Sequence, residues 1–440
     1  MTTSEWLAVL EIVTGLLLGL PLIRSLALRA GASPEVARKA VHVATGCTSV
    51  ALPWIFERPL PVWVLTGIVT VILGLLRVIP ALRSGIGSVL HGIQRLSYGE
   101  VLFAPAVAVV FHGARGDPLL VVIPLGILTV SDAAGALAGT RWGRRRYGCG
   151  KGFKTVEGSA FFLATAFFCV FVPLLCCGRV DLIHALWISL ILATLAMLAE
   201  GISARGFDNL VIPLGCFFVL NRLLPLDTPA LAGRILVIAL LLALMVAGSR
   251  WSTLNGRSLL GAVLLGYGCA ALADWRFALP PVAVFVCHVV TIRRYRLTKV
   301  FDHRFDVVWA HALGCLPWVV LASSATLSRL TCLAGVSFAM ATQLTMVDMT
   351  TLSWLGHFSP KPLRSTLKGW LIAGLPGLVW FWPDYGRLWL PVGLALLATL
   401  LAISLLRWVR PRCRAHVTGL WLIEGFLALA ASLPALLIRP

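Results

Sequence analysis

SDAAGALAGTRWGRRRYGCGKGFKTVEGS spans residues 131–159 and determines how the surrounding chain must fold. It starts with Asp132 inside an apolar run, passes a basic loop, and returns to apolar sequence after Ser159. The loop's cations are Arg141, Arg144, Arg145, Arg146, Lys151 and Lys154. An acid in a membrane helix is costly and usually functional, and glycines and cations before a helix N-terminus are typical of phosphate sites. The segment predicts two membrane helices joined by a phosphate-binding loop, with metal-assisted phosphate chemistry at a membrane surface.

The composition is that of a membrane protein. Of 440 residues, 59% are hydrophobic and only 12% are charged, and the mean hydropathy is +0.92. Apolar runs recur along the whole chain, which predicts a polytopic helical bundle. The net charge of +19 is explained by short loops that orient the helices, so we expect no nucleic-acid partner. The eleven cysteines are scattered without a CxxC pair, which favours apolar packing over metal binding or disulfides.

Run lengths and helix breakers predict an all-α transmembrane bundle of about 14–16 spans in two pseudo-repeated halves. The expected domains are residues 1–228, which concentrate the polar motifs, and residues 229–440, which repeat the architecture. The approximate span centres are Leu17, Ser49, Ile68, Ala106, Leu125, Phe168, Leu190, Cys216, Leu240, Leu265, Val284, Leu316, Ala339, Gly374, Leu396 and Ala428. The first run, Leu7 to Leu28, contains Glu11 and lacks a small-residue cleavage site, so we expect a retained helix.

The distribution of cations predicts the orientation. With sixteen spans and an outside N-terminus, 28 of the 37 Lys and Arg residues fall on one face. Positive loops stay on the cytoplasmic side, so the loop after Asp132 is expected to face the cytoplasm. We expect a multi-pass protein of the cell inner or plasma membrane.

The first basic motif follows a predicted helix start. Ser33 can cap a helix whose first turn contains Pro34, and Arg38, Lys39 and His42 follow. Arg38 and His42 are four residues apart and share one helical face. Cations that snorkel from the end of a span would give the same pattern.

Carboxylates form a second group of polar motifs. Glu100 lies at the start of the fourth span, where interaction with the helix dipole could also explain it. The segment that connects the seventh and eighth spans contains Glu200, Asp208 and Asn209. Their oxygen atoms suit Mg²⁺, although an ordinary capped loop is an equal alternative. Asp132 could likewise be satisfied by a polar group of a neighbouring helix, and Thr155 and Ser159 could be N-caps of the sixth span.

The second half repeats the architecture without the same polar residues. Its thirteenth span corresponds to the fifth, and counting back seven from Gly356 gives Met349, whereas seven back from Gly139 gives Asp132. Asp348 is off by one residue, about 100° around the helix. We therefore expect this half to be a degenerate relative of the first.

Five motifs in order carry a resemblance to a known family. They are Arg38-Lys-x-x-His42-x-x-x-Gly46, Tyr98-Gly-Glu100, Ser131-Asp-Ala-Ala-Gly-Ala-Leu-Ala-Gly139, Lys154-Thr-Val-Glu-Gly-Ser159 and Glu200…Gly206-Phe-Asp-Asn209. Together they resemble the phytol kinase and dolichol (polyprenol) kinase family, related to phosphatidate cytidylyltransferases, over roughly residues 30–225. The resemblance implies transfer of the terminal phosphate of CTP, or of a related nucleoside triphosphate, to the hydroxyl group of a long isoprenoid alcohol such as phytol or a polyprenol, with a divalent metal. The second half resembles the phytyl-phosphate kinase family more faintly, at Asn255–Ala262 and around Gly356–Pro362. That family would have acids near Met349 and Trp354.

The resemblance and the motifs together assign roles to individual residues. Asp132, Glu100 and Lys154 are expected to be catalytic, while Asp132, Glu200, Asp208 and Asn209 are expected to hold Mg²⁺ or Mn²⁺. The residues expected to bind the nucleotide and its phosphates are Arg38, Lys39, His42, Gly135, Gly139, Arg144, Arg145, Lys151, Thr155, Gly158 and Ser159. Two alternatives stay open: a cytidylyltransferase-like enzyme that also uses CTP, and a transporter with internally repeated halves.

Overall fold

The computed structural model describes residues 1–78, 98–147, 153–296, 305–354, 362–381, 386, 388–409 and 417–438. The described chain is almost entirely helical and contains one two-stranded hairpin. It divides into two units, Met1–Ile235 and Leu236–Pro440. The division falls within α12, whereas the sequence placed the domain boundary after residue 228, at the beginning of that helix.

Every predicted span centre falls in a helical segment. Eleven helices of the described chain are long and apolar enough to cross a membrane, and Gly99–Ala114 and Gly256–Leu272 are shorter apolar helices. In a bilayer, backbone groups must bond within their own segment, so long apolar runs become helices. The predicted all-α polytopic class is confirmed, and the chain has the helices of an integral membrane protein.

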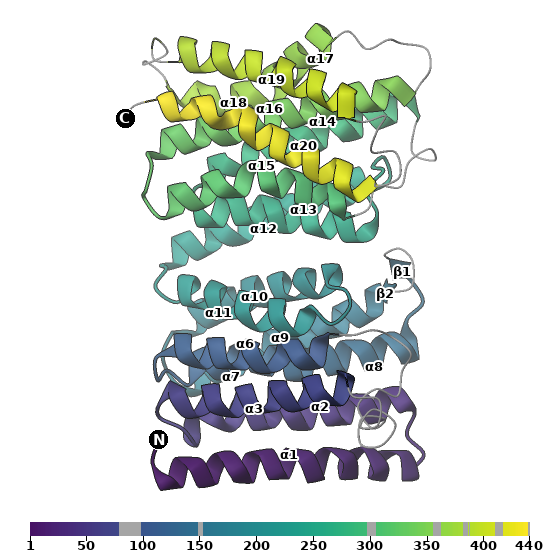
Figure 1. Ribbon diagram of the computed structural model, residues 1–440, viewed down its shortest axis with the longest axis vertical. Coiled ribbons are helices and arrows are strands. Elements are labelled where there is room, and N and C mark those ends of the chain that lie inside the picture. The colour runs from purple at the N-terminus through teal and green to yellow at the C-terminus, as the bar shows by residue number, and fades with distance from the viewer. Residues whose placement is uncertain are drawn as a thin grey trace. The chain divides into compact units, whose positions relative to one another are not determined.

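The first unit contains the hairpin and most of the polar motifs. Its elements are α1 (Thr3–Arg29), α2 (Pro34–Ala51), η1 (Leu52–Trp54), α3 (Pro59–Val78), α6 (Gly99–Ala114), α7 (Leu119–Gly126), the π-helical turn η2 (Ile127–Ser131), α8 (Asp132–Trp142), β1 (Arg146–Tyr147), β2 (Lys154–Thr155), α9 (Val156–Cys176), α10 (Leu182–Ile202) and α11 (Asp208–Leu223). The helix α12 (Thr228–Ser249) follows and continues into the second unit. Figure 1 shows the helices of the first unit from α1 to α11 side by side, with α1 at the edge.

The continuous helix α7–η2–α8 is the centre of the first unit. In its most apolar stretch of 18 residues, 61% of the residues are buried, against 6% in the corresponding stretch of α1. Ile123, Leu125, Ile127 and Leu128 are fully buried, so the turn before Asp132 lies in the core. The helical hydrogen-bond pattern widens to a π turn immediately before that residue. Such π segments are rare and frequently occur at functional sites.

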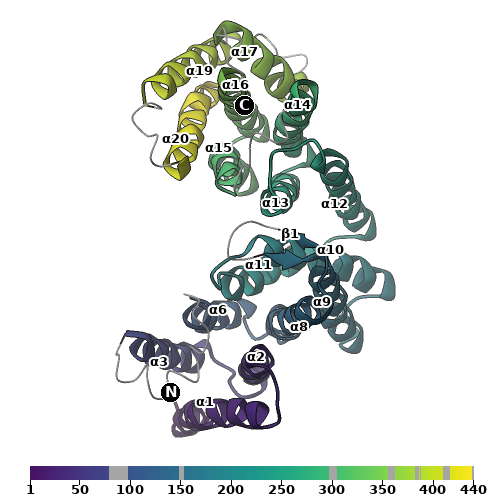
Figure 2. The same cartoon turned by 90° about the vertical axis from the view of Figure 1, so that its right-hand side faces the viewer.

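The second unit is built around α16. Its elements are α13 (Gly256–Leu272), η3 (Trp275–Ala278), α14 (Leu279–Tyr295), α15 (Asp306–Ser323), α16 (Arg329–Trp354), α17 (Pro362–Gly369), the π-helical turn η4 (Trp370–Gly374), α18 (Leu375–Leu378), η5 (Val379–Phe381), α19 (Trp389–Val409), α20 (Val417–Ser432) and η7 (Leu433–Leu437). The apolar window of α16 is 89% buried, and Figure 2 shows α14, α15, α19 and α20 grouped around it. Asp132 and Asp348 thus lie on the most buried candidate span of their respective units.

Candidate active site

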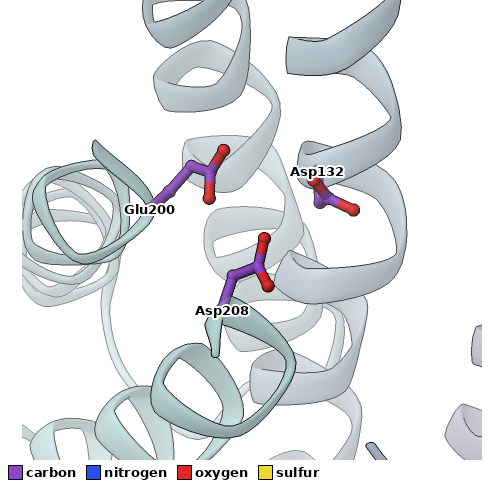
Figure 3. A group of neighbouring side chains, drawn as sticks. All are labelled: Asp132, Glu200 and Asp208. Carbon is purple, nitrogen blue, oxygen red and sulfur yellow. The ribbon is translucent and has the colours of Figure 1, made fainter. Parts of the chain in front are cut away.

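Three carboxylates from separate helices meet in the first unit. Asp132 begins α8, Glu200 lies in the last turn of α10, and Asp208 begins α11. One oxygen of each lies within 4.8 Å of the others, and Figure 3 shows the three side chains turned toward one space. The sequence named all three as metal ligands, although 68 residues separate Asp132 from Glu200. The tertiary structure places them close enough to share one ion.

Two lysines are paired with this carboxylate cluster. Lys39 Nζ lies 2.5 Å from Asp132 Oδ2, and Lys154 Nζ lies 2.5 Å from Glu200 Oε1. Lys39 is only 3% exposed. His42 Nε2 lies 3.3 Å from the same Asp132 oxygen and 3.2 Å from the carbonyl oxygen of Leu128. Three carboxylates and two ammonium groups therefore occupy one end of the unit.

The donor set fits a hard divalent cation. Carboxylate oxygens are the ligands that Mg²⁺ and Mn²⁺ prefer. Glu200 Oε2 is buried and has no hydrogen-bond partner within the described chain. A buried carboxylate oxygen normally has a hydrogen-bond partner or binds a metal. This oxygen and the two neighbouring carboxylates are thus suited to hold such an ion.

Close packing fixes the position of Asp132. A Cβ on Gly46 in α2 would lie 2.1 Å from Thr129 Oγ1 in the π turn, so only glycine permits this crossing. The crossing brings Lys39 and His42, on the same helix, beside Asp132. Ser33 caps α2 by accepting a hydrogen bond from Val36 N at 3.3 Å, as the sequence predicted. Gly46 therefore allows α2 to pack close enough for Lys39 and His42 to contact Asp132.

The basic loop is closed at its base by the hairpin and by Glu157. The strands pair Arg146 with Thr155 and Tyr147 with Lys154. Glu157 accepts hydrogen bonds from Arg144 N at 3.1 Å and from Arg145 N at 3.3 Å. The backbone of both arginines is thereby held at the N-terminus of α9. Their side chains are exposed to solvent.

The two predicted hydroxyl residues have different roles at the start of α9. Thr155 is its N-cap and accepts from Gly158 N at 3.1 Å, which confirms one of the two predicted caps. Ser159 is not the cap; its hydroxyl lies 2.6 Å from the hydroxyl of Tyr147 in β1. Ser159 therefore joins the loop to the helix.

Three glycines predicted to bind phosphate lie at the crossing of α8 and α9. A Cβ on Gly158 would lie 2.8 Å from the carbonyl oxygen of Gly135, and one on Gly139 would lie 2.9 Å from Thr155 Oγ1. A Cβ on Gly135 would lie 3.1 Å from the carbonyl oxygen of Gly158. These residues allow the helices to approach closely and so hold the loop beside Asp132. Their contact with a nucleotide stays a prediction.

The other predicted residues lie at the same end or outside the described residues. Arg38 is exposed and pairs with Glu35 at 2.6 Å, so it lies apart from the buried Lys39. Glu100 is in the first turn of α6, whose start is joined to the α10–α11 turn by Tyr98 N donating to Arg205 O at 2.8 Å. Asn209 follows Asp208 in α11 and donates its backbone N–H to that carboxylate at 3.1 Å. Lys151 lies outside the described residues.

Sequence reasoning missed two relationships. It assigned Lys39 to phosphate without pairing it with Asp132, and it gave Glu157 no role. A buried acid in a membrane helix requires a cationic or polar partner, which was the available signal for the pairing. An acid in the first turn of a helix that follows a basic loop was the signal for Glu157.

In the corresponding region of the second unit, the residues that the structure describes form no such cluster. Asp348 accepts a hydrogen bond from Ser365 at 2.7 Å and forms an ion pair with Lys368. Met349 is buried in an apolar cluster with Met346, Ile403, Leu406 and Ala428. Among the described residues, Asp132, Glu200 and Asp208 form the one group of three side chains suited to a metal.

Comparison with known proteins points in the same direction. The chain is 28% identical to a phytol kinase from Synechocystis sp. over 190 residues, which is 41% of this chain and 76% of the relative. The chain is distantly related to the phytol kinase family. No family model matches the chain, and no solved structure matches it.

Proposed function

We propose that this chain is a membrane kinase that transfers the terminal phosphate of CTP to the hydroxyl group of a long-chain isoprenoid alcohol. The convergence of Asp132, Glu200 and Asp208 beside a basic loop carries the proposal. The similarity to a phytol kinase supports the reaction class and the type of acceptor. The choice of CTP rests on the motif resemblance. A kinase with the same acceptor could use another nucleoside triphosphate, and the donor is therefore tested separately from the acceptor.

Phosphoryl transfer depends mainly on positioning and charge neutralisation rather than on covalent chemistry. Asp132, Glu200 and Asp208 would hold Mg²⁺ or Mn²⁺. Such an ion, when bound, neutralises charge on the phosphate oxygens. Lys39 and Lys154 lie against two of the same carboxylates, so their ammonium groups can donate to phosphate oxygens next to those carboxylates. The residues thereby gather opposite charges around the group being transferred.

The basic loop and the start of α9 would bind the rest of the nucleotide. Arg144 and Arg145 expose their guanidinium groups while Glu157 holds their backbone. The N-terminus of a helix attracts phosphate through free N–H groups and the helix dipole. Arginine side chains bind phosphate through paired hydrogen bonds. We assign the triphosphate to this loop, and Glu100 and His42 to the neighbouring wall of the site.

The position of the site near the end of the helices suits an amphipathic acceptor. Figure 1 shows the hairpin and the start of α2 at one end of the first unit. Most of the chain's cations belong to the segments expected on this face. We therefore place this face on the cytoplasmic side of the membrane, where nucleotides are available. The alcohol's hydroxyl would approach Asp132 while its tail stays in the bilayer. The second unit would support folding or lipid access without a second phosphorylation.

The decisive experiment uses purified full-length protein with Mg²⁺, CTP labelled in the terminal phosphate, and a panel of prenols. We expect a labelled prenyl monophosphate and CDP, and no labelled product from Asp132→Asn at a matched protein level. Release of pyrophosphate with a cytidylylated lipid would indicate a cytidylyltransferase. Uptake of substrate into proteoliposomes without chemical change would indicate a transporter. Full turnover by Asp132→Asn would show that the site is misplaced.

A further inference from the structure

A groove in the second unit combines a charged end with an apolar wall. It runs along α14 from Leu279 to Tyr295 and has a cavity volume of about 610 Å³. Its other side is formed by Asp348 of α16 and by residues of α17 and η4. No step of the proposed kinase reaction uses this groove.

The charged end of the groove carries an excess of positive charge. Arg294, Arg364 and Lys368 line it together with one acid, Asp348. Lys368 and Ser365 already satisfy Asp348, and Lys368 also lies 3.3 Å from Thr291 Oγ1. Within the described chain, neither Arg294 nor Arg364 has an ion-pair partner, and both are exposed. Both guanidinium groups can therefore bind an anion through paired hydrogen bonds.

The apolar wall continues from this cationic end along the membrane-spanning helix. Val282, Val286 and Val290 line it, and the latter two are 39% and 57% exposed. Fifteen residues of α-helix rise by about 22 Å. The wall from Leu279 to Arg294 is therefore longer than the hydrocarbon depth of one leaflet, which is about 15 Å. Exposed apolar side chains on a membrane helix face lipid chains rather than water. The groove is complementary to an anionic lipid, because its cationic end suits a negatively charged head group and its apolar wall suits a hydrocarbon chain.

We propose that this groove binds an anionic phospholipid of the surrounding bilayer. The phosphate group is held by Arg294 and Arg364, and an acyl chain lies along α14 over Val286 and Val290. Basic pockets between transmembrane helices bind anionic lipid headgroups in this manner. Because Lys368 is held by Asp348, the two arginines carry the specificity for the anion. The binding site is independent of the proposed kinase activity.

The test measures lipid retention by native mass spectrometry and thermal stability of the full-length protein in mixed micelles. Phosphatidylglycerol is compared with phosphatidylcholine at equal mole fraction. We expect preferential retention of phosphatidylglycerol with a matching rise in melting temperature. In the Arg294→Gln/Arg364→Gln variant, affinity for phosphatidylglycerol should fall roughly tenfold or more, because two charge-assisted contacts are lost. Val290→Trp should reduce retention separately by filling the chain groove.

The matched control is Arg250→Gln/Arg329→Gln, which removes two exposed arginines of the second unit that do not line the groove. It should retain phosphatidylglycerol as the unmodified protein does. Equal retention of both phospholipids, or equal loss in the control variant, would overturn the proposal. So would equal stabilisation by inorganic phosphate alone, which needs no acyl chain. Tighter binding of a prenyl monophosphate than of phosphatidylglycerol would also overturn it, because the ligand would then be a single-chain lipid.

Discussion

Replacing Asp208 with Asn tests the carboxylate cluster without relying on catalysis. Two unit charges 4.8 Å apart, the upper bound on the cluster's oxygen separations, repel by about 3.5 kcal/mol at an effective dielectric constant of about 20. Asp208 forms no ion pair within the described residues and is half-buried, whereas Asp132 and Glu200 are each paired with a lysine. The two neighbouring ammonium groups and solvent screening together lower the expected net gain to about 1–2 kcal/mol. Loss of the favourable helix-dipole interaction at the start of α11 offsets about 0.5 kcal/mol. The repulsion is the larger effect, so the variant should be more stable than the unmodified protein when metal is chelated.

Metal should reverse the advantage of the variant. Tightly bound metal at a hundred times its dissociation constant stabilises a protein by about 2.7 kcal/mol. If the loss of one carboxylate weakens binding at least about tenfold, the same metal concentration stabilises Asp208→Asn by about 1.4 kcal/mol or less. The assay is thermal unfolding of detergent-solubilised protein in chelator and in Mn²⁺. Glu57→Gln, which neutralises an exposed carboxylate remote from the cluster in sequence, is the control and should behave as the unmodified protein. The shared metal site would be refuted if Asp208→Asn melted at a lower temperature than the unmodified protein in chelator. It would also be refuted if Mn²⁺ raised the melting temperatures of the two proteins equally.

Three further sets of substitutions test helix packing, nucleotide binding and the chemical step separately. Gly158→Ala should cost about 1–3 kcal/mol in unfolding free energy through overpacking, whereas Gly67→Ala, whose methyl group meets nothing within 4 Å, should not destabilise the protein. Replacing the three arginines at 144–146 with Gln should weaken nucleotide binding roughly tenfold or more; unchanged affinity with unchanged loop topology, checked by fluorescent tags, contradicts the phosphate-binding loop. Asp132→Asn should lower turnover at least about a hundredfold, while Asp348→Asn should stay within about a fewfold, because its acid is already held by other side chains. A prenyl diphosphate that disappears with Asp348→Asn would show a second working kinase.

The sequence alone predicted the helical segments, two helix caps and the relationship to phytol kinase. All sixteen predicted span centres lie in helical segments, because an apolar run in a bilayer has no other way to satisfy its backbone. The caps at Ser33 and Thr155 follow from side chains within three residues of the N–H groups they accept from. The order of the five motifs was enough to indicate a relationship to phytol kinase. These features depend on short stretches of chain or on residue order, so no tertiary contact is needed to find them.

The division between the two units and the irregular turns within helices could not be predicted from the sequence. The division between the units falls inside α12, just after Arg234 and at the start of an apolar run. The π turn at Ile127–Ser131 likewise lies within such a run. It is accompanied by the close crossing of Gly46 over Thr129, a contact between segments more than eighty residues apart in sequence. Periodicity within one segment carries no information about such a crossing.

Tertiary structure alone decided which charges meet. Lys39 and Arg38 are adjacent in sequence, yet Lys39 is buried against Asp132 and Arg38 is exposed beside Glu35. The sequence named Asp132, Glu200 and Asp208 together without fixing a distance between them, and it did not separate a metal site from a capped loop. A buried charge is tolerated only where its partner is brought within a few ångströms. That partner is supplied by the packing of distant helices, which is a property of the folded unit and not of any one segment.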